Sequence, residues 1–209
     1  TIRDGGLTNG SHFTTETVRG VYRAACEAGV DYVELGYRNS KELLSPDEFG
    51  AWRFCDESDL RQATDGIDPR GTKMSVMMDA HTSSLDDVGS CDESVLDMIR
   101  VATYVKDIDR AIRLANCVTD QGYEGAMNIM AISQEGSPFL DEALQQIEEE
   151  TDVKCVYIVD SYGALYCEEV DFLVSKNNYQ SITILFSPVD GIFNGLIKVD
   201  HFFPNAGDI

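Results

Sequence analysis

The first six residues of the chain, TIRDGG, place a cation and an anion side by side ahead of two glycines. A carboxylate such as Asp4 can bind a divalent metal ion, and the guanidinium of Arg3 can hold a developing oxyanion with two hydrogen bonds. This pairing is typical of enolate chemistry on a metal. Because Arg-Asp pairs at strand ends are more often turn salt bridges, the interpretation needs support from other residues.

Two further acidic residues are candidates for a site. Glu34 lies inside an apolar stretch at residues 32–37, where an inward-facing charge is costly unless it is paired. Its structural alternative is an ion pair with Arg3 or Arg100. Asp160 follows another apolar run, and its alternative role is to cap the next helix.

The chain has three histidines, His12, His81 and His201, and none are two residues apart. His81 follows a predicted strand and could act as a general base, although an exposed loop histidine is the commoner case. The six cysteines are dispersed without a Cys-x-x-Cys spacing, which argues against a zinc site or a disulfide framework. An aromatic loop at residues 46–54 could be a lid or specificity loop, but packing is the commoner role for such residues.

Apolar periodicity predicts alternating strands and helices. A helix is predicted over 14–28, with Thr14 as its N-cap and Gly29 as its end, and further helices begin near Ile108 and at Ser137. After a short strand that ends at Arg3-Asp4, buried strands are predicted at residues 32–37, 73–80, 98–105, 126–132, 156–159 and 182–186.

This alternation predicts an α/β fold with parallel strands joined by right-handed crossovers. A dinucleotide-binding fold would need Gly-x-Gly-x-x-Gly after its first strand, and the chain has none there. The polar residues gather at the predicted carboxyl ends of the strands, where barrel enzymes carry their sites. A TIM (β/α)8-type barrel is therefore the favoured fold.

Composition limits the possible partners and location. The 209 residues, 43% of them hydrophobic, are enough for one globular domain with a substantial core. The formal net charge of −21 would repel phosphate backbones and anionic lipid surfaces, so neither nucleic acid nor membrane partners are expected. No apolar run approaches the roughly 20 residues that cross a bilayer, and a cytoplasmic location is predicted.

Four short motifs in order resemble the DRE-TIM metallolyase superfamily: TIRDGG at the start, VELG at 33–36, IRVA at 99–102 and VDSYG at 159–163. The branch that they most resemble is the HMGL-like, aldolase-type catalytic domain, similar to 4-hydroxy-2-oxovalerate aldolase. The resemblance covers residues 1–176, taken as barrel strands one to six, and residues 177–209 form a divergent or truncated C-terminal segment of the same domain.

The resemblance implies a barrel that holds a divalent ion, usually Mn²⁺ or Mg²⁺, against the keto and carboxylate oxygens of a 2-oxo acid. Asp4 matches the family's aspartate ligand to the metal, and Arg3 matches the arginine that stabilises the metal-bound enolate. Glu34 and Asp160 match acidic positions that shape the site. Ser161 matches a serine that contacts the substrate.

The chain departs from the family pattern at two histidine positions. The aldolase branch keeps a basic histidine at a position that is Leu7 here, so His12 would be a displaced substitute as general base. The family's His-x-His metal ligands belong to a strand that reads SITILFS at residues 181–187, without histidine. The residues after 176 are also too few for two closing βα units, so the barrel is expected to be incomplete.

The sequence therefore leaves two classes of function open. The first is a divalent-metal-dependent carbon–carbon lyase that cleaves a 4-hydroxy-2-oxo acid to pyruvate and an aldehyde, with the 2-oxo acid as its small-molecule partner. The second is a non-catalytic or incomplete barrel module that lacks the His-x-His ligands. The open strand edges of such a module would favour pairing with another chain, so a homo-oligomer is possible.

Overall fold

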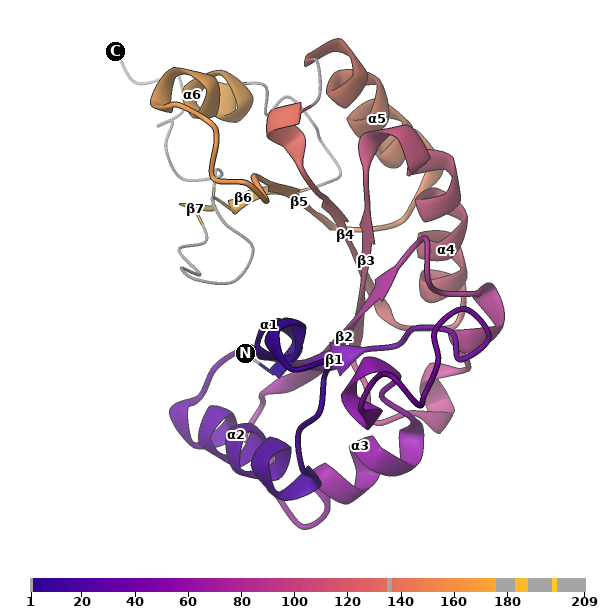
Figure 1. The fold of residues 1–209 in the computed structure, drawn as a ribbon. Coiled ribbons are helices and arrows are strands. Elements are labelled where there is room, and N and C mark those ends of the chain that lie inside the picture. The colour runs from indigo at the N-terminus through magenta and orange to yellow at the C-terminus, as the bar shows by residue number, and fades with distance from the viewer. Residues whose placement is uncertain (1, 135–136, 176–182, 188–196, 199–209) are drawn as a thin grey trace.

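The computed structural model describes residues 2–134, 137–175, 183–187 and 197–198 (Figure 1). The strands are β1 (Tyr32–Tyr37), β2 (Lys73–Asp79), β3 (Met98–Thr103), β4 (Glu124–Ile129), β5 (Cys155–Val159), β6 (Thr183–Ser187) and β7 (Ile197–Lys198). The helices are α1 (Ile2–Gly5), α2 (Thr15–Ala28), α3 (Glu57–Thr64), α4 (Ile108–Asp120), α5 (Ser137–Glu150) and α6 (Cys167–Ser175). The predicted domain boundary at 176/177 lies outside the described residues.

The strands form one sheet in the order in which they occur in the chain, from β1 to β7. The first six pair in parallel and β7 pairs antiparallel to β6. Figure 1 shows the described strands as a curved sheet, with helices α2 to α6 along its outer side and α1 next to β1 on the inner side. Sequential parallel order with helices outside is the arrangement of a TIM-type barrel, so the predicted fold class is confirmed, and the described strands form an open arc of it.

The two faces of the sheet differ because side chains alternate along a strand. One face packs against the helices in a continuous apolar core, to which each central strand contributes. Its members include Val33, Leu35, Val76, Met78, Ile99, Val101, Met127, Ile129, Val156 and Ile158. The other, concave face carries the intervening residues, among which are Glu34, Arg100 and Asn128. The alternation of side chains thus brings these polar residues together on the inside of the arc.

The helix ends follow local chemistry, as predicted. The hydroxyl of Thr14 accepts a hydrogen bond from the backbone N–H of Thr17 at 3.1 Å, which caps α2. Gly29 ends that helix with a φ of 67°, a conformation that glycine adopts at little cost. The predicted helices near Ile108 and at Ser137 are α4 and α5. The predicted bounds of β1 match the observed ones, and those of the later strands differ by at most three residues.

One expectation about the elements is wrong. Residues Ile2–Gly5 form a helical turn, α1, so Arg3 and Asp4 do not end a strand. Gly5 keeps a helical φ of −58°, and the segment buries Ile2 beside β1 instead of adding a strand to the sheet. The connection from β2 to β3, for which no helix was predicted, holds the short 3₁₀ turns Leu85–Asp87 and Cys91–Glu93. Among the described helices, none is long and apolar enough to span a membrane.

Candidate functional site

Arg3 and Glu34 form the centre of a buried polar network on the concave face. The Nε atom of Arg3 donates to Oε2 of Glu34 at 2.8 Å, and its Nη2 atom lies 2.6 Å from Oδ1 of Asp4. The Nη1 atom also reaches the hydroxyl of Tyr37 at 3.4 Å. Arg3 has 5% of its side chain exposed and Glu34 has 10%, so both charges are largely removed from water. The motif at the start of the chain and the acidic residue of β1 therefore meet, as the sequence suggested.

A second arginine completes this network from β3. Arg100 donates from Nη1 to Oε1 of Glu34 at 3.0 Å and from Nη2 to Oδ1 of Asn128 at 2.8 Å. Its guanidinium carbon also lies 4.3 Å from the ring centroid of Tyr157 on β5. Both structural alternatives considered for Glu34 are thus realised together, because the carboxylate bridges Arg3 and Arg100.

The electrostatics of the network follow from burial and opposite charge. Burial alone raises the pKa of Glu34, but the attraction of Arg100 and Arg3 outweighs it, so the pKa lies below its ordinary value. Burial lowers the pKa of Arg3, and the neighbouring Glu34, Tyr37 and Asp4 more than reverse this, so the pKa is raised. The pKa of Tyr37 is raised, chiefly because its hydroxyl is desolvated. The site therefore holds a permanent guanidinium, an ionised carboxylate and a neutral phenol.

A further arginine at this site was missed by the sequence analysis. The guanidinium carbon of Arg53 lies 4.4 Å from the ring centroid of Tyr37 and 5.0 Å from that of Phe49. The aromatic loop had been interpreted mainly as packing, which is correct for Trp52 and Phe54, since both are buried. The signal that could have indicated this contact is an aromatic residue, Phe49, four positions before Arg53, in the loop that follows a strand ending in Tyr37.

Of the two carboxylates at this centre, that of Glu34 is held by Arg3 and Arg100, so that of Asp4 is the candidate for a divalent ion. Its Oδ1 atom already contacts Arg3, and the part of the chain that the structure describes contains no group of three histidine, cysteine or acidic side chains able to hold a metal. One carboxylate is an incomplete ligand set for Mn²⁺ or Mg²⁺. The described residues therefore do not by themselves fit the implied ion. Strand β6, which covers 183–187 of the segment expected to carry the family's histidines, has none.

The predicted base, His12, lies on an exposed loop after α1. Its Nε2 atom is 3.3 Å from the backbone oxygen of Glu48, the residue before Phe49. The loop of His12 is thus fastened to the loop that carries Arg53. His81 is also exposed, and its Nε2 atom lies 2.9 Å from Oδ2 of Asp107.

Asp160 and Ser161 lie after β5 and form a second polar group. Asp160 is 3% exposed, and its Oδ2 atom accepts from the N–H of Leu165 at 2.9 Å. That bond orders the loop before α6 and does not cap the helix, so the capping alternative is wrong. The Oδ1 atom of Asp160 is buried without a hydrogen-bond partner among the described residues. Ser161 accepts from the N–H of Ala131 at 3.0 Å, which fixes its side chain against the end of β4.

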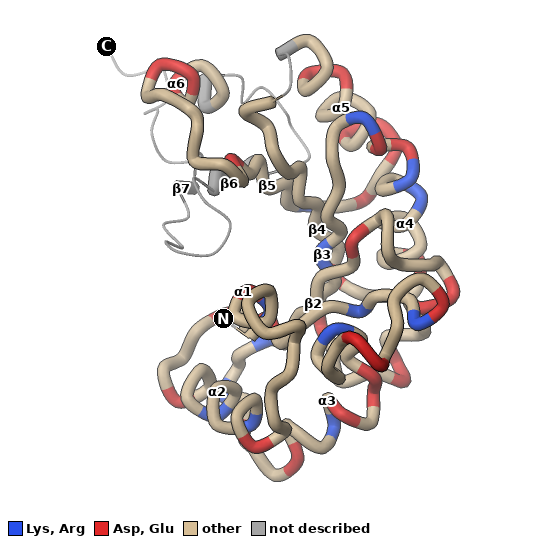
Figure 2. Tube along the Cα trace, viewed as in Figure 1, with Lys and Arg blue, Asp and Glu red and all other residues tan. Residues whose placement is uncertain are grey.

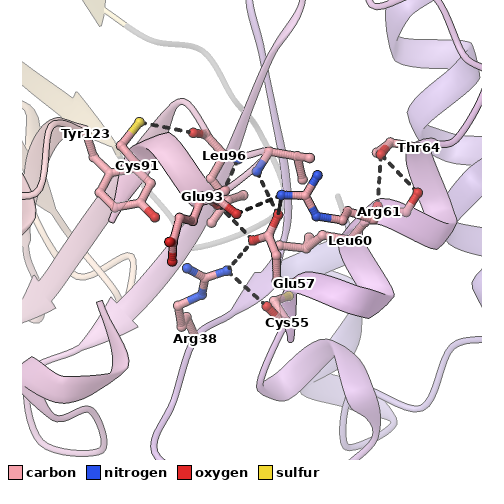
Figure 3. Close-up of polar contacts among 12 residues, drawn as sticks. Arg38, Cys55, Glu57, Leu60, Arg61, Thr64, Cys91, Glu93, Leu96 and Tyr123 are labelled. Atoms are coloured by element: carbon pink, nitrogen blue, oxygen red, sulfur yellow. Dashed lines mark hydrogen bonds and ion pairs between the residues drawn. The ribbon is translucent and has the colours of Figure 1, made fainter. Parts of the chain in front are cut away.

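A cavity of about 430 Å³ lies elsewhere, beside Arg38, Glu57 and the β2–β3 connection. Figure 3 shows the polar contacts around it, in which Glu57 lies between Arg38 and Arg61. Most of these groups are already bonded to one another or to backbone carbonyls. We therefore regard the concave face, where arginines, an aspartate and aromatic rings converge, as the candidate site, and the outer cavity as a feature of the connection.

Known proteins similar to this chain include several 4-hydroxy-2-oxovalerate aldolases. That of Rhodococcus jostii (strain RHA1), aldolase 3, is 25% identical over 174 residues, which cover 81% of this chain and 50% of the relative. That of Thermus thermophilus is 24% identical over 169 residues, covering 81% of this chain and 48% of the relative. The chain thus spans about half the length of these relatives. No family model matches it.

Solved structures agree with this relationship. The N-terminal domain of a candidate aldolase from Bacteroides vulgatus superposes with a TM-score of 0.72 at 28% identity, covering 89% of this chain and 61% of that one. An N-acetylneuraminic acid synthetase from Leptospira borgpetersenii has a TM-score of 0.52 at 14% identity, over 82% of this chain and 59% of that one. The second likeness concerns the fold alone. The resemblance found in the four motifs is confirmed.

Proposed function

We propose that this chain, which resembles the DRE-TIM metallolyase superfamily and is similar to 4-hydroxy-2-oxovalerate aldolases, is a carbon–carbon lyase of aldolase type. Its proposed reaction cleaves a 4-hydroxy-2-oxo acid to pyruvate and an aldehyde. The observation that carries the proposal is the buried guanidinium of Arg3, which Glu34 and Asp4 hold on the concave face. A desolvated, fixed cation is what a developing enolate oxygen needs.

The cleavage requires one proton to leave and one negative charge to be held. A base removes the proton of the C4 hydroxyl, the C3–C4 bond breaks, and the hydroxyl carbon becomes the aldehyde carbonyl. The bonding electrons pass to the other fragment as the enolate of pyruvate, which takes a proton at C3. Arg3 suits the enolate oxygen because its raised pKa keeps it cationic at every working pH and its partners fix its orientation.

The other predicted residues take supporting roles in this proposal. Glu34 positions Arg3, His12 is the general base, and Asp160 and Ser161 shape and contact the bound substrate. The superfamily resemblance implies Mn²⁺ or Mg²⁺, which would act as a Lewis acid and of which Asp4 would be a ligand. Because the described residues contain no group of three side chains able to hold a metal, we assign no step to the ion.

The partners, assembly and location of the protein stay predictions. A small 2-oxo acid is the proposed substrate, in keeping with the names of the relatives. The net charge of −21 supports the expectation that neither nucleic acid nor membrane is a partner. A homo-oligomer and a cytoplasmic location are both consistent with the chain, and measurement of its mass in solution would test the first.

The proposal is tested by pyruvate release from 4-hydroxy-2-oxovalerate, with Mn²⁺ or Mg²⁺ supplied. We expect turnover by the unmodified chain, and a loss of about 10²–10³ in kcat for Arg3→Lys, because lysine lacks the planar pair of donors. Asp4→Asn should abolish both turnover and Mn²⁺ binding, and isothermal titration measures the binding. The matched control is Arg113→Lys, which changes an exposed arginine of α4 and should leave kcat unaltered.

Two results would contradict the proposal. A kcat of Arg3→Lys equal to that of the unmodified chain would show that Arg3 does not take part in the chemistry. No pyruvate from the unmodified chain with either ion would favour the second class of function, a non-catalytic barrel module, which the absence of histidine from 181–187 already suggested.

A further inference from the structure

Arg53 is held between two aromatic rings at the edge of the candidate site. Its guanidinium lies over Tyr37 at 4.4 Å and over Phe49 at 5.0 Å, and Tyr37 in turn meets Arg3 through its hydroxyl at 3.4 Å. Both arginines therefore touch the same phenol. Arg3 is engaged by two carboxylates, whereas Arg53 stacks on π faces, which leaves the edge of its guanidinium and its donors available.

The charge of Arg53 has no counter-charge in the described structure. Among the described residues no carboxylate pairs with it, and its Nε atom is buried without a hydrogen-bond partner. The chain nevertheless carries 37 acidic residues, which recur along the outer helices and loops (Figure 2). A partly buried cation that pairs with none of so many anions is a costly arrangement, and it becomes favourable when an anion arrives from outside.

The loop that presents Arg53 is fixed on both sides. A side chain at Gly50 would come within 2.3 Å of the backbone oxygen of Ser11, and one at Gly36 would come within 2.1 Å of that of Trp52. The indole N–H of Trp52 also donates to the backbone oxygen of Phe13 at 3.1 Å. Close backbone approach at these points holds the residues around Arg53 in place. The guanidinium is therefore preorganised, which reduces the entropy lost when it binds a ligand.

We propose that Arg53 binds a second anionic group of the substrate, at the end remote from the 2-oxo group. This inference rests on the proposed function, in which the 2-oxo acid end lies at Arg3. The substrate class would then be a 4-hydroxy-2-oxo acid whose aldehyde half ends in a carboxylate or a phosphate, and the aldehyde product would carry that anion. Arg53 would act as a specificity-determining residue, because its planar donors match the oxygens of either group.

The first test measures binding without turnover. Isothermal titration compares 2-oxoglutarate, which has a terminal carboxylate, with 2-oxopentanoate, which ends in a methyl group. Neither has a C4 hydroxyl, so neither can undergo the cleavage. We expect 2-oxoglutarate to bind the unmodified chain about tenfold more tightly or better, the scale of a hydrogen bond to a charged group. Arg53→Gln should bring the two affinities together, and the exposed-arginine control Arg113→Gln should retain the difference.

A second variant guards against a simple folding defect. Arg53→Lys keeps a cation between the two rings but loses the planar fork, so we expect it to fold and to retain only part of the discrimination. An analogue of 2-oxoglutarate with a phosphonate in place of the terminal carboxylate identifies the anion. Tighter binding of the phosphonate assigns the subsite to phosphate, and tighter binding of 2-oxoglutarate assigns it to carboxylate. Equal binding of 2-oxoglutarate and 2-oxopentanoate by the unmodified chain would overturn the inference.

A kinetic comparison separates this inference from the proposed function. Pyruvate release is measured from 4-hydroxy-2-oxovalerate and from the analogue whose C5 is a carboxylate, and the ratio of the two kcat/KM values is taken. Turnover of both at equal kcat/KM would keep the aldolase proposal and reject the anion subsite. No turnover of either, with discrimination still seen in binding, would keep the subsite and reject the aldolase chemistry.

Discussion

Two regions of this molecule contain a glutamate between two arginines, and they are built differently. On the concave face, Glu34 bridges Arg3 and Arg100, whose side chains are 5% and 16% exposed. On the outer side, Glu57 lies between Arg38 and Arg61, and Arg61 is 55% exposed (Figure 3). The same combination of one glutamate and two arginines is therefore desolvated in one place and partly hydrated in the other.

The two clusters differ in the further hydrogen bonds that their charged side chains make. Glu57 accepts from the N–H of Val95 at 2.8 Å and from the hydroxyl of Ser94 at 2.9 Å, so it fastens the helix-free β2–β3 connection to α3. Its partners Arg38 and Arg61 also donate to backbone carbonyls. Glu34 has no such backbone bonds in the described structure, and the Nε atom of Arg100 is buried without a partner. The outer cluster acts as a structural tie, whereas the inner one holds charges ready for a ligand.

The largest expected effect comes from Glu34→Gln. Removing this charge leaves Arg100 without its carboxylate and Arg3 with that of Asp4 alone, and the loss of one partner from a buried ion pair typically costs about 3–5 kcal/mol. Urea unfolding at pH 7, with the m-value checked, measures the change in the free energy of unfolding. If Glu34→Gln lost less free energy of unfolding than Glu57→Gln, its counterpart in the outer cluster, the proposed difference between the two clusters would be wrong.

The pH dependence of the same variant sharpens this prediction. The ordinary pKa of Glu34 is 4.5, and attraction by the two arginines lowers it in the folded state. The carboxylate therefore stabilises the fold fully above pH 4.5, and this contribution is lost as the pH falls through the lowered value. We expect the unmodified chain to lose more stability between pH 5 and pH 3 than Glu34→Gln does. Parallel curves would show that Glu34 is not the group responsible.

The outer counterpart, Glu57→Gln, should have a smaller effect. The amide oxygen can still accept a bond from Val95 or Ser94, and Arg38 keeps its bonds to the carbonyls of Cys55 and Val88. We expect a loss of about 1–3 kcal/mol, the range for a hydrogen-bonded group that is only partly compensated. The same urea titration measures it. A loss equal to that of Glu34→Gln would mean that exposure does not separate the two clusters.

The smallest effect is expected for Arg61→Gln. This side chain is more than half exposed, so water replaces its ion pair with Glu57 at little cost, and exposed pairs contribute about 0–1 kcal/mol. The difference in the free energy of unfolding between the unmodified chain and Arg61→Gln should be smaller still in 0.5 M salt, because salt screens the remaining attraction between Arg61 and Glu57. A loss above 2 kcal/mol that is independent of salt would show that the outer cluster behaves as a buried one.

Much of the fold could be predicted from the sequence because it rests on local patterns. The apolar periods placed β1, β2 and α2, and Thr14 and Gly29 marked the ends of that helix correctly. The short segment at the start was misjudged, because four residues contain too few repeats to separate a strand from a helical turn. The β2–β3 connection is fastened by Glu57, which bonds Ser94 and Val95 from 37 and 38 residues earlier in the chain, a contact that no local pattern reveals.

The candidate site was only partly visible in the sequence. Arg3, Asp4 and Glu34 were predicted together, and the structure joins them directly. The aromatic cage of Arg53 was not predicted, because Tyr37 and Phe49 come from a strand end and a loop that meet only in three dimensions.

By itself the sequence determined the alternation of strands and helices, the strongly acidic charge and the four motifs that resemble those of the superfamily, because each depends on neighbouring residues or on composition. Only the tertiary structure decided which charges pair. Glu34 could have met either arginine, and it meets both because α1 brings Arg3, and β3 brings Arg100, to the face of the curved sheet on which β1 carries Glu34. It also decided that Arg53 would be left beside Tyr37 without a described counter-charge, since burial and packing set the partners of a charge more than its position in the chain does.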